Sequence, residues 1–294
     1  MGRLMTAPEH RQLDRVSALL DLNRPEQALE ELGRLPAGQV GTVRAFQLRA
    51  AALTELDRWA EVATTARHGL GQGPDAELLG RLGLALRHLG QYPSAERALL
   101  DALALAPHSA WLLAQYADLC LLVGQTAKAE ALIARAAAVD PVSPTVYASR
   151  YQLAYARDDT RGAEQVAREF LGRYPEHPSA LALHGLAAAG RGRMGVASRS
   201  LGQAVAQDPT AAAAAEAARE ARVYAHPLLL PLRPLYRLGV FPTWLIAVGT
   251  LLTLNLLGWA PAALAVGLCW AVYCVYSWVA PPIVRRLVLG RWRG

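Results

Sequence analysis

Residues 79–107 read LGRLGLALRHLGQYPSAERALLDALALAP, and this stretch decides the fold. It ends at a proline that recurs at 34-residue intervals, as Pro107, Pro141, Pro175 and Pro209. Alanines keep the same interval, as Ala95, Ala129, Ala163 and Ala197. Turn-forming residues keep it too, as Gly90, Gly124, Asp158 and Gly192. Three residue types in step over four copies predict stacked structural repeats.

Each residue type in the repeat has a physical role. The Gly or Asp suits a tight turn between two helices, and the small alanine lets the helices approach closely. The proline cannot continue a helix and so ends the second one. One helix pair cannot bury its apolar face alone, so the pairs must stack. The sequence therefore predicts an all-α solenoid of helix-turn-helix units.

The pattern resembles that of the tetratricopeptide-repeat (TPR) family, whose units place a large residue, Leu-Gly or Leu-Ala, Ala and Pro at fixed offsets. The best copy carries Leu79, Leu82-Gly83, Leu86, Ala95, Leu99 and Pro107. A weaker copy has Arg150 where an apolar residue is expected. Upstream lie a copy one residue shorter, residues 46–74, and a degenerate first copy, residues 13–35. We expect about six repeats, closed by an alanine-rich helix from Ala211 to Ala221, in a solenoid domain over residues 1–225.

The charges divide the chain into two parts. Every Asp and Glu precedes residue 221, and no charged side chain lies between Leu238 and Val284. The net charge of +6 comes entirely from Arg233, Arg237, Arg285, Arg286, Arg291 and Arg293. Because these arginines flank the apolar segment and the repeats are formally neutral, we expect no nucleic-acid partner.

Two apolar runs, residues 241–259 and 262–279, predict a two-helix transmembrane hairpin over residues 241–281. Each run is ~27 Å long as a helix, close to the thickness of a bilayer core. Gly258 and Pro261 break the helix between the runs, while Pro242 and Pro281-Pro282 are expected to mark its outer ends. Residues 226–240 should be a juxtamembrane segment with leucines at the lipid interface, and residues 282–294 a basic tail. A buried hairpin in a soluble protein is disfavoured, because a thin solenoid cannot cover it.

The flanking arginines also predict an orientation. They lie outside both ends of the hairpin and none lies in its turn, so both termini should be cytoplasmic in a multi-pass protein of a prokaryotic inner membrane. The segment from Met1 to Arg11 has no apolar run, so we expect no secretory signal. Asn255 is the one strongly polar side chain in the first span. We expect it to pack against the other span or a second protomer, as a homo-oligomer through the membrane helices would allow.

Motifs that suggest chemistry have plainer explanations. Residues 190–195, GRGRMG, match a dinucleotide-binding fingerprint, but they fall between two predicted helices rather than after a strand. The histidines show no metal-ligand spacing, and neither do Cys120, Cys269 and Cys274. Asp158-Asp159 falls in an inter-helix turn, where Asp caps helices. We therefore predict no catalytic site, no cofactor, no metal site and no enzyme.

The resemblance implies that the first helix of each repeat lines a concave surface that binds a protein or peptide partner. Helical spacing places on this face Arg44, Gln47, Glu77, Arg87, His88, Trp111, Asp118, Gln152 and Tyr155. The lysines and asparagines with which some TPR domains clamp a carboxylate are replaced by Gln47, Ala51, Glu77 and Arg81. The leading prediction is a membrane-anchored scaffold or adaptor, with lipid contacts through the hairpin. The alternative is a small channel or transporter subunit regulated by its TPR domain.

Overall fold

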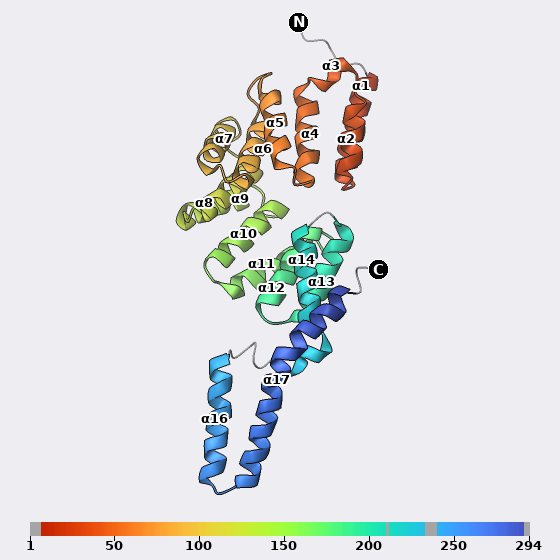
Figure 1. Cartoon of the computed structure of the whole chain (residues 1–294). Helices are drawn as coiled ribbons and strands as arrows, with labels where there is room; N and C mark the ends of the chain where they lie inside the picture. Colours follow the sequence, from red (N-terminus) through yellow and green to blue (C-terminus); the bar gives the residue numbers. More distant parts are fainter. Residues whose placement is uncertain (1–6, 210–211, 233–239, 291–294) are drawn as a thin grey trace. The chain divides into compact units, whose positions relative to one another are not determined.

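The structure is a computed structural model that describes residues 7–209, 212–232 and 240–290. These residues form sixteen α-helices and one 3-10 helix, with no strand among them (Figure 1). The chain divides into two compact units, Met1–Pro175 and Glu176–Gly294. The all-α prediction is confirmed for the described part of the chain.

Unit 1 contains five helix pairs and one short extra helix. The first two pairs are α1 (Ala7–Asp21) with α2 (Pro25–Gly33), and α4 (Val43–Glu55) with α5 (Trp59–Leu70), separated by α3 (Ala37–Val40). The other three are α6 (Ala76–His88) with α7 (Tyr92–Leu105), α8 (Ala110–Leu122) with α9 (Thr126–Val139), and α10 (Pro144–Ala156) with α11 (Thr160–Arg173). Within the unit, the first helix of a repeat also packs on the first helix of the next repeat, as in the α8–α10 contact.

The turn inside each pair carries a residue in the left-handed backbone conformation. These residues are Asn23, Asp57, Gly90, Gly124, Asp158 and Gly192, with φ between 54° and 77°. Gly, Asn and Asp are the residue types that adopt this conformation at least cost. Since Asn23 lies between α1 and α2, the degenerate first copy folds like the others. The interval from Asp57 to Gly90 is 33 residues, one fewer than the repeat interval of 34, and it corresponds to the shorter copy seen in the sequence.

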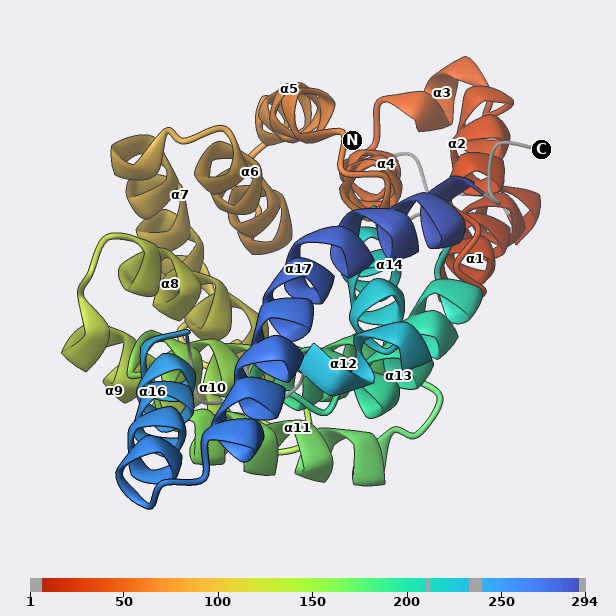
Figure 2. The same cartoon turned by 60° about the horizontal axis from the view of Figure 1, so that its bottom comes forward.

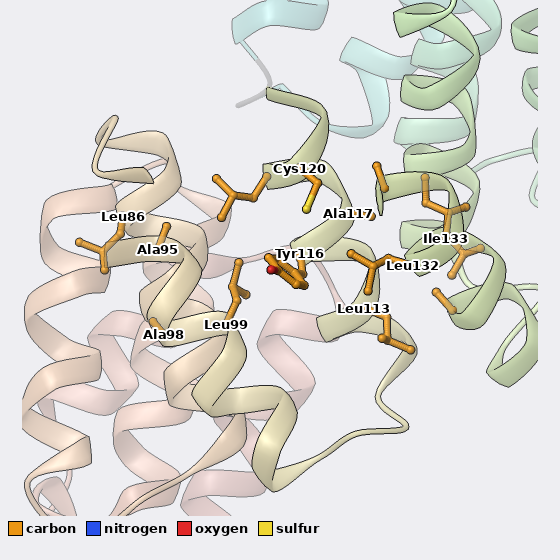
Figure 3. Close-up of a cluster of buried hydrophobic side chains, with 14 residues drawn as sticks. Leu86, Ala95, Ala98, Leu99, Leu113, Tyr116, Ala117, Cys120, Leu132 and Ile133 are labelled. Atoms are coloured by element: carbon orange, nitrogen blue, oxygen red, sulfur yellow. The ribbon is translucent and has the colours of Figure 1, made fainter. Parts of the chain in front are cut away.

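The in-step alanines lie where paired helices meet. Ala95, Ala129 and Ala197 are fully buried. Figure 3 shows Ala95 and Ala117 within a cluster of buried side chains from α6 to α10. Leu99, in the same cluster, has no exposed surface. Burying apolar area of this kind stabilises by about 25 cal/mol per Å², so the clusters between stacked helices hold the unit together.

The fifth repeat, the weaker copy that contains Arg150, compensates for its departures from the pattern. Arg150, in an expected apolar place, points its guanidinium at Glu169, with Nη2 to Oε2 at 3.3 Å. It also lies over the ring of Tyr147. Tyr151 stands where other repeats have Gly or Ala, and it is buried. The residue sixteen positions later is Ala167, whereas Gly83 is followed at that distance by Leu99. A large residue on one helix is thus matched by a small one on its partner.

Unit 2 begins with the sixth repeat, α12 (Pro178–Gly190) and α13 (Met194–Gln207). Gly185 lies against Leu201 in the way that Gly83 lies against Leu99. The next helix is α14 (Ala212–Tyr224), in the region where an alanine-rich closing helix was expected. Its Ala218 and Ala221 pack on Ala197 and Leu201. Small apolar side chains let α14 cover the last repeat closely.

The rest of unit 2 is the 3-10 helix η1 (Pro227–Leu232) and a hairpin of α16 (Val240–Leu256) and α17 (Ala260–Gly290). Gly258, with φ of 71°, forms the turn of the hairpin. One helix of the described residues, Ala260–Val288, is long and apolar enough to cross a membrane, judged by length and composition. The first helix of the hairpin is also apolar but shorter than the predicted span, because Leu257 to Trp259 form the turn.

Two details of the hairpin differ from expectation. Pro281 and Pro282 do not end the second helix, since α17 continues through them to Gly290. Each proline removes one backbone hydrogen bond, and packing offsets this loss. Val284 beyond them is fully buried against η1, and the Tyr273 hydroxyl donates to the Pro231 carbonyl at 3.1 Å.

Two leucines of the segment before the hairpin differ from the predicted lipid-facing arrangement, whereas Leu228 is exposed. Leu229 and Leu232 are buried against α17 rather than turned outward, because η1 closes over the helix. The Tyr276 hydroxyl donates to the Leu228 carbonyl and ties the two elements together. The prediction for residues 233–239, and for four of the flanking arginines, falls outside the described residues. Those four are Arg233, Arg237, Arg291 and Arg293.

Candidate binding groove

Five of the nine predicted groove residues line one pocket of about 480 Å³ in unit 1. They are Arg87, His88, Asp118, Gln152 and Tyr155. They come from the last turns of α6, α8 and α10, the first helices of three successive repeats. The structure therefore brings together side chains that lie up to 68 residues apart in the sequence.

The pocket is completed by three apolar residues that the sequence prediction missed, Leu121, Leu122 and Ala156. The repeat itself could have found them. Arg87, Leu121 and Tyr155 are separated by 34 residues each, and so are His88, Leu122 and Ala156. In-step residues of stacked repeats occupy equivalent places, so a face defined by one member extends to the others.

A partly buried ion pair forms the polar wall of the pocket. Arg87 Nη1 lies 3.4 Å from Asp118 Oδ2 and donates to the Gln115 carbonyl at 3.4 Å. Burial lowers the pKa of Arg87, while Asp118 acts in the opposite direction. Burial likewise raises the pKa of the Asp118 carboxyl, opposed by Arg87 and by the hydroxyl of Ser149. The two formal charges cancel, so the wall is polar but neutral overall.

His88 forms a second, aromatic wall. Its ring stacks on Trp59, with centroids 3.8 Å apart and planes within 5°. Burial and the neighbouring Arg87 lower the pKa of His88, and the effect of Asp57 opposes this shift. A neutral, stacked imidazole is held in place by its neighbour and offers a flat face rather than a charge.

The rim of the pocket is apolar and open to solvent. Tyr155 is 69% exposed and Leu122 is 61% exposed. Gln152, also exposed, supplies an amide with donor and acceptor atoms between them. Exposed aromatic and aliphatic surface beside fixed polar groups is typical of sites that take a partner side chain and hydrogen-bond its backbone.

The other predicted groove residues lie elsewhere. Glu77 and Trp111 line a separate pocket of about 440 Å³ at the opposite ends of α6 and α8. Arg81 occupies it, pairing with Glu77 at 3.0 Å and lying over the Trp111 ring at 5.7 Å. These two predicted residues are therefore already engaged within the chain.

Gln47 and Arg44, on α4, support the junction between repeats. The Gln47 amide donates to both oxygens of Asp75 at 3.1–3.2 Å. Asp75 in turn caps α6 by accepting from the backbone of Leu78. Arg44 donates to Gln47 at 3.4 Å. This network fixes the start of α6, which is a structural role.

Asn255 is exposed on α16, so its side chain is not enclosed within the hairpin. Its packing against the other span or against a second protomer stays a prediction. Residues 190–195 form the end of α12, the turn at Gly192 and the start of α13, without the strand that a dinucleotide fingerprint requires. Among the described residues, no group of three or more His, Cys, Asp or Glu could hold a metal ion.

Comparison with known proteins agrees with the helix-pair architecture. Residues 86–153 match a family model described as tetratricopeptide repeat. No curated protein sequence matches the chain. Six of the eight residues that line the pocket lie within the matched segment.

Several solved structures have a similar fold. PilW, described as a widely conserved type IV pilus biogenesis factor, is 18% identical, with a TM-score of 0.52 over 72% of this chain and 99% of that chain. A thermophilic TPR protein of Thermus thermophilus is 20% identical, with a TM-score of 0.56 over 62% and 99%. The Cut9–Hcn1 hetero-tetramer of the APC/C is 14% identical, with a TM-score of 0.56 over 73% and 43%. These similarities show the TPR fold of the repeats.

Proposed function

We propose that the chain is a membrane-anchored TPR adaptor that binds a protein or peptide partner between α6, α8 and α10. The observation that carries this proposal is the pocket built from in-step positions of three successive repeats. The stacked repeats supply its walls, and its rim is an apolar surface exposed to solvent. TPR folds are typically non-catalytic scaffolds for protein interactions.

The chemistry of the pocket favours an uncharged anchor. The Arg87–Asp118 pair is neutral overall and closed on itself, and His88 carries a lowered pKa. A partner side chain with a net charge would lose water without gaining a full counter-charge. A leucine or aromatic side chain would instead bury surface against Tyr155 and Leu122. The exposed amide of Gln152 suits the backbone of an extended segment.

Anchoring through the hairpin is supported by composition and length. The chain has no charged side chain from Leu238 to Val284, and α17 is long enough to span. Arg285 and Arg286 follow directly. With arginines outside both ends of the hairpin, positive charge favours a cytoplasmic location for both termini and for the repeats.

The test uses the full-length protein in mild detergent. A captured partner would be identified by mass spectrometry and its affinity measured by calorimetry. We expect Tyr155→Ala to weaken binding by ~2 kcal/mol, about 30-fold, as for an interface hot spot. The matched control is Tyr92→Ala, which removes a half-exposed tyrosine from α7, the second helix of its repeat.

Equal affinity of the two variants for the partner would refute the pocket as the binding site. The anchor is tested separately by fractionation. A protein that leaves the membrane at high pH or high salt would be peripheral, and the proposed spanning hairpin would then be wrong.

A further inference from the structure

A second pocket lies within unit 2, between α14, η1 and α17, and has a volume of about 430 Å³. Figure 2 shows the C-terminal part of α17 beside α14. The helix α14 supplies Glu216, Arg219 and Glu220. Arg285 faces them from α17, one turn beyond Pro281. Two carboxylates and two guanidiniums thus share one cavity.

These four charged side chains are not paired with one another. Across the described part of the chain, the side chains of Glu216, Arg219, Glu220 and Arg285 form no hydrogen bond and no ion pair. All four are exposed. Unpaired groups of both signs around a cavity leave a space that a ligand with both charges would complement.

The floor of the cavity is apolar and firmly held. Leu229 lines it and is almost completely buried. Pro281 and Pro282 form the side toward the apolar part of α17. The hydroxyl bonds from Tyr273 and Tyr276 to η1 hold this floor against the helix. The walls therefore come from elements that are fixed to one another within unit 2.

The position of the cavity along the chain indicates its surroundings. Arg285 is the first charged residue after the apolar run that starts at Leu238. If α17 spans a bilayer as proposed, its residues 281–285 lie where hydrocarbon gives way to headgroups. A phospholipid there would place its phosphate and its terminal group at the level of the cavity.

We propose that this cavity binds the headgroup of a phospholipid with a primary amine, the phosphatidylethanolamine class. Arg219 and Arg285 would hold the phosphate, since guanidinium groups match phosphate oxygens. Glu216 and Glu220 would accept hydrogen bonds from the ammonium. A choline headgroup has no N–H to donate, and a purely anionic headgroup would face two carboxylates without compensation. The inference rests on the proposed membrane anchor.

The test places the full-length protein in bilayers of equal parts phosphatidylcholine, phosphatidylethanolamine and phosphatidylglycerol. After gentle extraction, the lipids that remain bound are quantified by mass spectrometry. We expect selective retention of phosphatidylethanolamine, and a loss of about tenfold in Arg285→Gln, the size of one charge-assisted hydrogen bond. The matched control is Arg286→Gln, which removes the same charge one residue away and outside the cavity.

The carboxylates give a second, sign-specific readout. The double variant Glu216→Gln and Glu220→Gln should lose the preference for the amine and gain retention of phosphatidylglycerol. If Arg285→Gln and Arg286→Gln lose phosphatidylethanolamine retention equally, the effect comes from general surface charge, and the site is overturned. Binding of water-soluble glycerophosphoethanolamine as strong as that of the lipid would overturn the assignment to a bilayer.

A protein that enters the bilayers but retains all three lipids equally overturns the headgroup site alone. A protein that does not enter bilayers at all overturns the proposed anchor, and the headgroup site with it. The two failures are therefore distinguishable in one preparation.

Discussion

Replacing Gly83 by alanine tests how closely the paired helices pack. A Cβ at this position would lie 2.6 Å from Leu99 Cγ and 3.3 Å from the Ala95 carbonyl oxygen. Leu99 has no exposed surface, so it has no free space to move into. Gly202, in the interior of α13, is the control, since its nearest heavy atom to an added Cβ is the end of a flexible arginine at 3.9 Å.

The expected magnitude follows from two opposing effects. Glycine costs ~1 kcal/mol relative to alanine inside a helix, so Gly202→Ala should stabilise the protein by about that amount. Gly83→Ala gains the same helix propensity but overfills the core, which costs ~1–3 kcal/mol. The two variants should therefore differ in free energy of unfolding by roughly 1–3 kcal/mol.

The assay is urea unfolding of the full chain in mild detergent, followed by helical circular dichroism. Hydrogen exchange in peptides from α6 and α7 would locate the change. Removing the obstruction provides the sharpest test, because Gly83→Ala should become stabilising in a Leu99→Ala background. The close-packing argument is refuted if Gly83→Ala stabilises the wild type as much as Gly202→Ala does. It is also refuted if Gly83→Ala changes the free energy of unfolding in the same direction in both backgrounds.

Three further predictions concern the turn after α10, the ion pair and the cluster beside α8. Asp158 has a positive φ of 54° and Asp159 caps α11, so Asp158→Gly should raise and Asp159→Ala lower the unfolding free energy, each by ~1 kcal/mol in thermal or urea unfolding. Burial raises the pKa of Asp118, so the folded state binds more protons there, and the free energy of unfolding should fall as pH rises above the ordinary Asp range. In a pH series of unfolding curves, Asp118→Asn should flatten that fall. An unchanged slope would contradict this prediction. Hydrogen bonds from Tyr116 and Lys128 lower the pKa of Glu96, which stabilises the fold above the ordinary Glu pKa and is lost on acidification; Tyr116→Phe should remove ~1 kcal/mol at neutral pH and less in acid.

The local features of the repeats could be predicted from the sequence because they depend on residues near one another. Gly90 and Gly124 set the turns, in-step alanines mark the helix contacts, and prolines end the units. The sequence also placed Arg87, Asp118 and Tyr155 on one face, since the period carries one face through all copies. The same period would have added Leu121 and Leu122, had it been applied to the groove.

The sequence by itself determined the periodic part of this protein, because each repeat encodes its own turn, the contact between its two helices and the end of its second helix. The tertiary structure decided which side chains engage one another across repeats. It paired Arg87 with Asp118, and Arg81 with Glu77. It also carried α17 through Pro281, which local rules would make a helix end, since burial of Val284 against η1 offsets the missing hydrogen bond. Long-range packing of this kind depends on how elements meet in space, and no spacing along the chain records it.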